Sequence, residues 1–66
     1  MQTFYYLVRK NPSDSSKLQY FLGNLEWAGM DVDRIRLRLY SNRSLAEVMQ
    51  NHYPEAEILE TQIAVL

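Results

Sequence analysis

The segment from Arg34 to Tyr40 constrains the fold more than any other part of this chain. Its residues alternate strictly, so an extended strand places basic and aromatic side chains on one side and aliphatic side chains on the other. The first set is Arg34, Arg36, Arg38 and Tyr40. A strand with one face in a core and one face in water needs this pattern. We therefore predict a half-buried strand over residues 34–40 with a positive outer face.

Two further strands flank it in the sequence. Residues 3–9 are rich in aromatic and β-branched side chains, which favour strands. Either face of this strand suits a core, and we favour the face of Phe4, Tyr6 and Val8. Residues 57–65 alternate less cleanly and predict the last strand.

Two helices are expected between the strands. Over residues 15–28, apolar residues recur at steps of three and four and predict one apolar stripe, and Gly29 is suited to end the helix. The stripe consists of Leu18, Phe21, Leu22, Leu25 and Ala28. Ser44 and Glu47 fit a capping box, and Pro54 stops a second helix that runs to residue 51 or 52. In that helix we expect Leu45, Val48 and Met49 to face inward.

The expected order is strand–helix–strand–helix–strand in a single domain over residues 1–66. This is an α/β (or α+β) plan, and right-handed crossovers place both helices on one face of a three-stranded sheet. The alternation of residues 34–40 favours a bare second face. An antiparallel last strand stays an open alternative.

The size of the chain limits how stable it can be alone. A domain of 66 residues buries only about 60% of the surface that its unfolded chain exposes. The sequence has no cysteine, which excludes disulfides and thiolate metal sites, and one histidine is too few for an ordinary zinc site. We expect no metal and no cofactor. Self-association is then the simplest way to bury more surface.

The arginine face is one candidate binding surface. Arg34, Arg36, Arg38 and Tyr40, with Tyr5 beside them, match the way sheets hold single strands of nucleic acid by stacking and charge. The net charge of −1 argues against that function. The arginine side chains can instead pair with carboxylates of the same chain, such as Glu60.

Aromatic and aliphatic residues form the other candidate surfaces. On the predicted helix 15–28, Tyr20 and Trp27 project opposite the apolar stripe, which is typical of a protein contact. The last strand ends in an apolar run that includes Ile63 and Val65, so two copies can join edge to edge.

The sequence contains no constellation for catalysis, since His52 has no nucleophile or carboxylate held beside it. Apolar runs are too short to cross a membrane, and no export signal precedes the first strand, so we expect a cytoplasmic protein. We expect a small, non-catalytic protein-interaction or regulatory module that acts through a preformed surface. Its partner is a second copy or another protein, and nucleic-acid binding is the alternative.

Overall fold

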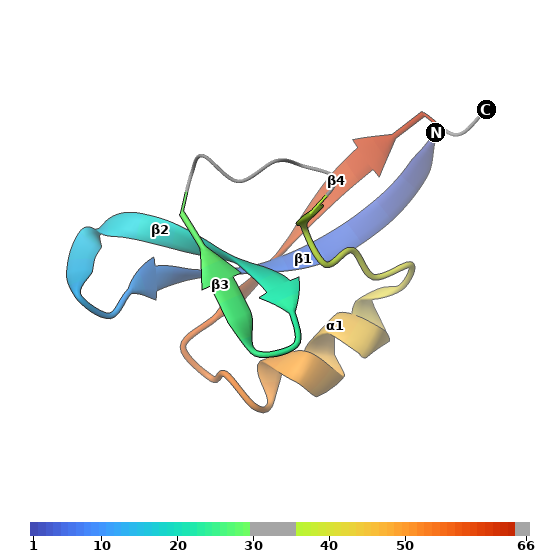
Figure 1. Ribbon diagram of the computed structural model, residues 1–66. Coiled ribbons are helices and arrows are strands. Elements are labelled where there is room, and N and C mark those ends of the chain that lie inside the picture. The colour runs from blue at the N-terminus through green and yellow to red at the C-terminus, as the bar shows by residue number, and fades with distance from the viewer. Residues whose placement is uncertain (30–35, 65–66) are drawn as a thin grey trace.

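A four-stranded antiparallel sheet and one short helix make up the fold (Figure 1). The computed structural model describes residues 1–29 and 36–64. The strands are β1 (Gln2–Asn11), β2 (Asp14–Gly23), β3 (Glu26–Ala28) and β4 (Glu57–Ile63), and the helix is α1 (Arg43–Gln50). Their order in the sheet is β3-β2-β1-β4, with every pair antiparallel. The predicted plan of three strands and two helices is wrong, and the fold is a small α+β domain.

The predicted helix over residues 15–28 is a β-hairpin instead. β2 and β3 pair through Tyr20–Ala28 and Phe21–Trp27, and Asn24 and Leu25 form the turn between them. Both turn residues have positive φ, +51° and +65°, as a two-residue hairpin turn of this hand requires. The apolar stripe therefore does not exist, because alternation along the strand sends its members to opposite faces.

The predicted arginine strand is also wrong. Arg34 lies outside the described residues, and residues 36–39 form no strand. Tyr40 makes a single bridge to β1, in which the backbones of Tyr40 and Tyr5 exchange two hydrogen bonds. The Arg38 N–H donates to the Phe21 carbonyl at 3.1 Å. Residues 38–40 thus cross from β2 to β1, and their backbone bonds, rather than side-chain alternation, fix their place.

The remaining elements agree with their predicted positions. β1 and β4 cover the predicted strands, β4 in the antiparallel direction, and α1 covers the predicted second helix. Its N-cap is Asn42 and not Ser44: the Asn42 side-chain oxygen accepts the N–H of Leu45 at 3.1 Å. The buried face of the helix also differs from the predicted one. Ala46 is fully buried, while Leu45 and Val48 are 48% and 61% exposed.

The core lies between the sheet and α1. Leu7, Phe21 and Ala56 form its buried centre, and the partly buried residues packed around it are Trp27, Met49, Tyr53 and Ile58. The helix side of β1 is therefore the side of Leu7, contrary to the predicted inward face of Phe4, Tyr6 and Val8. The cause is the hairpin, since β2 brings Phe21 to the Leu7 side of the sheet.

Candidate protein-interaction surface

The two faces of the sheet differ in what covers them. One face packs against α1 and the segment that follows it, and we call it the covered face (Figure 1). Because side chains of a strand alternate, the even-numbered residues of β1 from Phe4 to Lys10 lie on the other face, together with Leu18 and Tyr20 of β2 and the odd-numbered residues of β4. Within residues 1–29 and 36–64, no helix or strand packs on this second face.

The covered face contains an aromatic cluster. The ring centres of Phe21 and Trp27 lie 5.1 Å apart, those of Phe21 and Tyr53 5.5 Å apart, and those of Trp27 and Tyr53 5.2 Å apart. Such tilted and edge-on pairs stabilise by more than their buried area alone. The Trp27 ring nitrogen is buried and has no hydrogen-bond partner among the described residues.

Arg9 closes this aromatic cluster. Its guanidinium carbon lies 4.2 Å from the centre of the Trp27 ring and 5.9 Å from that of Tyr53. Its Nε donates to Gln19 Oε1 at 3.0 Å, and a terminal nitrogen lies 3.2 Å from Glu55 Oε1. With its side chain only 17% exposed, Arg9 is engaged within the chain and stabilises the covered face.

The second face is largely apolar, and we call it the apolar face. Its apolar members are Phe4, Tyr6, Val8, Leu18, Tyr20, Leu59 and Ile63. The rings of Tyr6 and Tyr20 lie 6.3 Å apart on neighbouring strands. Leu18, Leu59 and Ile63 are 41%, 39% and 39% exposed. Three half-exposed aliphatic side chains on one sheet face make a surface that water solvates poorly.

The predicted interface residues Tyr20, Trp27 and Ile63 divide between these faces. Tyr20 and Ile63 lie on the apolar face, whereas Trp27 lies in the aromatic cluster of the covered face. Val65 is outside the described residues. Sequence reasoning missed Phe4 and Leu18 as surface residues, although their even spacing with Tyr6 and Tyr20 was a usable signal.

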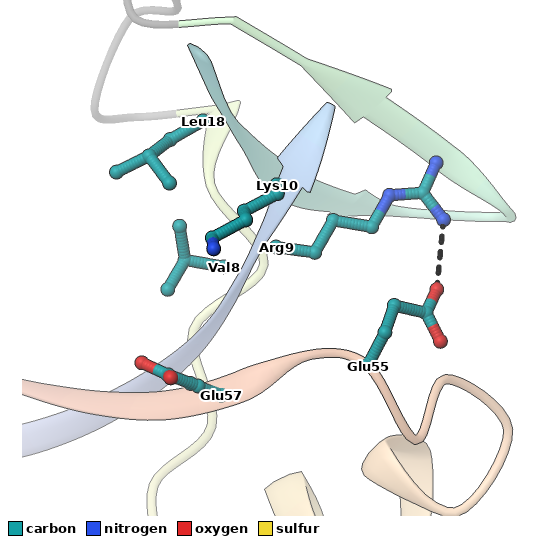
Figure 2. Close-up of a pocket in the computed structure, with 6 residues that line it drawn as sticks. All are labelled: Val8, Arg9, Lys10, Leu18, Glu55 and Glu57. Carbon is teal, nitrogen blue, oxygen red and sulfur yellow. Dashed lines mark hydrogen bonds and ion pairs between the residues drawn. The ribbon is translucent and has the colours of Figure 1, made fainter. Parts of the chain in front are cut away.

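A groove of about 420 Å³ lies at one end of the apolar face (Figure 2). It opens where β4 leaves β1, just beyond the Val8–Glu57 pair. Its lining residues are Val8, Arg9, Lys10, Leu18, Glu55 and Glu57. Figure 2 shows Lys10, Val8, Leu18 and Glu57 on one side of β1 and the Arg9–Glu55 pair on the other. The positive charges of Arg9 and Lys10 balance the negative charges of Glu55 and Glu57, so this groove has no preference for a ligand of either charge.

Residues 36–40 do not have the geometry of the predicted arginine site. Arg36 and Arg38 are exposed, but Tyr40 is buried at 8% exposure, and the Arg38 guanidinium stacks over its ring at 5.2 Å. Tyr5 lies on the covered face, bonded through its backbone to Tyr40. Arg38 and Tyr40 also line a second pocket of about 440 Å³ beside the β2–β3 turn. A row of guanidinium groups on a bare sheet, the basis of the nucleic-acid prediction, is not present in residues 36–40.

At the β1–β2 turn, hydrogen bonds shift the pKa of the Asp14 carboxyl group. The Ser16 hydroxyl donates to Asp14 Oδ1 at 2.6 Å, and the Ser16 backbone N–H donates to the same oxygen at 3.1 Å. Both bonds favour the ionised carboxylate and lower the pKa of Asp14 below its ordinary value of 3.8. This polar cluster is the turn of a hairpin, where the sequence had indicated the start of a helix.

Comparison of the chain with protein-family models, with curated proteins and with solved structures finds no match in any of the three. The described part of the chain contains no group of three metal-binding side chains. None of its helices has the length and apolar character needed to cross a membrane.

Proposed function

We propose that this chain is a small, non-catalytic interaction module that works by presenting the apolar face, and that its partner is a second copy of itself. The observation that carries the proposal is the contrast between the two faces. Charged and aromatic groups on the covered face find partners within the chain, while Leu18, Leu59 and Ile63 on the apolar face stay about two-fifths exposed.

A thin core supports self-association. Among the described residues, Leu7 and Phe21 are the only large side chains that are fully buried. A stable complex buries about 800 Å² on each partner, so a second copy would add buried apolar surface to a chain whose own core is small.

Molecular mass in solution tests the proposal. Light scattering or sedimentation of the natural chain over a wide concentration range should show a dimer that dissociates on dilution. Ile63→Glu places a charge on the apolar face and should weaken this dimer by about tenfold or more. Ser15→Glu adds the same charge at an exposed position near the β1–β2 turn, away from β4, and should leave the mass unchanged. A natural chain that stays monomeric up to about 1 mM contradicts the proposal.

A further inference from the structure

β4 forms one end of the sheet and has a free edge. Its inner edge pairs with β1 in a continuous register from Gln2–Ile63 to Val8–Glu57. In the part of the chain that the structure describes, no strand pairs with its outer edge (Figure 1). Free strand edges usually carry lysine, proline or a bulge that prevents pairing with another chain. The sequence of β4, Glu-Ile-Leu-Glu-Thr-Gln-Ile, contains no lysine or proline, and its register shows no bulge.

The backbone bonds of Tyr5 reveal which groups β4 leaves unpaired. Tyr5 and Tyr40 exchange hydrogen bonds of 2.9 and 2.8 Å, so the Tyr5 N–H and C=O point away from β4. The Tyr5–Glu60 pair is therefore a non-hydrogen-bonded pair, and its neighbours Phe4–Thr61 and Tyr6–Leu59 are hydrogen-bonded. By the same alternation, the backbone groups that point to the free edge belong to Ile58, Glu60 and Gln62.

We propose that β4 pairs antiparallel with β4 of a second copy across a two-fold axis, with Thr61 opposite Thr61. This inference rests on the self-association proposed above and names the edge that achieves it. In this register Glu60 lies opposite Gln62 of the second copy, and each pair occurs twice. Leu59 lies opposite Ile63 of the second copy.

Charge and apolar contact favour this register over the registers centred on Glu60 and on Leu59. In an antiparallel pair, residues whose backbone N–H and C=O groups point toward the partner strand must lie opposite one another. Ile58, Glu60 and Gln62 can therefore lie opposite only residues of the second copy that also point outward. Centring on Glu60 sets two like charges opposite each other, which is unfavourable. Centring on Leu59 sets Ile58 opposite an acid. Centring on Thr61 gives Glu60 an amide donor and lets the half-exposed Leu59 and Ile63 cover each other.

The same features favour a second copy as the occupant of this edge. An antiparallel edge is complementary to itself under two-fold symmetry, and the Glu60–Gln62 match arises only between two copies of this sequence. Pairing would join two sheets into one of eight strands, in which Leu59 and Ile63 are covered at the seam while Leu18, on β2, stays exposed.

Single cysteines test the register directly, because the natural chain contains none. Opposed residues of a non-hydrogen-bonded pair have Cα atoms ~4.5 Å apart, within the roughly 4.4–6.8 Å that disulfides span. Thr61→Cys should therefore give a covalent dimer under mild oxidation. Leu59→Cys and Glu60→Cys, displaced along the strand, should not. If a cysteine at position 59 or 60 forms the covalent dimer and a cysteine at position 61 does not, the proposed register is wrong. If none of the three variants forms a covalent dimer, the proposed edge pairing is wrong.

Proline supplies a second, independent test. Gln62→Pro removes an N–H that points outward, a place where edge strands accept proline, so the β1–β4 ladder should persist in circular dichroism and thermal unfolding. It should weaken the dimer about tenfold or more, while Gln62→Ala, which keeps the N–H and removes only the side-chain amide, should weaken it less. A dimer unchanged by Gln62→Pro contradicts edge pairing but leaves self-association standing. A monomeric natural chain contradicts both proposals.

Discussion

The two faces of one sheet use neighbouring residues in opposite ways. On the covered face, Phe21 is 1% exposed within an aromatic cluster, and Arg9 is held by two rings, an amide and a carboxylate. On the apolar face, Leu18, three residues earlier in β2, is 41% exposed. The difference shows that composition alone does not locate a core. The short helix covers only one face, and on the other Leu18, Leu59 and Ile63 stay about two-fifths exposed.

Phe21 and Leu18 give the largest expected contrast. Phe21→Ala removes the centre of the core and should lower the free energy of unfolding by about 4 kcal/mol, enough to unfold much of so small a domain. Leu18→Ala, three residues earlier on the same strand, should cost about 1 kcal/mol in the monomer. Urea unfolding followed by tryptophan fluorescence measures both, and equal losses would break the distinction between the faces.

Substitution of Arg9 measures how much its contacts on the covered face contribute to the free energy of unfolding. Arg9→Ala removes the stacking on Trp27 and the bonds to Gln19 and Glu55, and should cost about 2 kcal/mol of unfolding free energy. Glu55→Gln keeps an acceptor at a half-exposed position and should cost less than about 1 kcal/mol. An Arg9→Ala variant as stable as the natural chain would show that Arg9 is free for an external ligand.

Leu25 lies in the turn between β2 and β3 and belongs to neither face, so it tests the turn alone. Its φ of +65° is strained for a leucine, and its side chain is 80% exposed. Leu25→Gly should therefore raise the free energy of unfolding by about 1 kcal/mol, as thermal denaturation can show. Destabilisation by this substitution would mean that the Leu25 side chain contributes to packing. Leu45→Gly, in α1, should have the opposite sign.

The smallest effect is expected from pH at the β1–β2 turn. Because the folded-state pKa of Asp14 is lowered, its contribution to stability is present above the unfolded pKa and is lost as pH falls through the folded value. Ser16→Ala should be slightly less stable than the natural chain near pH 7, and this difference should vanish once the pH is low enough to protonate the Asp14 carboxylate in the folded state. A difference that persists in acid would assign the effect of Ser16 to something other than the carboxylate.

Sequence reasoning located three elements and misassigned two regions for identifiable reasons. The aromatic and β-branched run of β1 has no helical competitor, and Pro54 ends α1 wherever its cap lies. The apolar pattern of residues 15–28 fits both the helical period of 3.6 residues and the strand period of two residues. Phe21 and Leu22, for example, fit one stripe of a helix as well as the two faces of a strand. The signal that decides between them is the turn at Gly23-Asn24, where φ values of +90° and +51° end a strand.

The candidate surface could be predicted only in part. Alternation in β1 identified two possible inward faces, but which face becomes the core depends on Phe21, which the hairpin brings to Leu7. The alternation of residues 34–40 was real but did not determine a strand, because the backbone of Arg38 and Tyr40 bonds to β2 and β1 at isolated points. Ile63 was correctly placed on a strand, and its position on the apolar face follows from the β1–β4 register.

Amide hydrogen exchange along β4 at two protein concentrations is the most direct test of how this chain associates. The amides of Leu59 and Thr61 bond inward to β1 and should be protected at any concentration. We predict that the amides of Glu60 and Gln62 exchange rapidly in dilute protein and become protected when the concentration rises. Rapid exchange of Glu60 and Gln62 at every concentration would contradict pairing of β4 with a second copy.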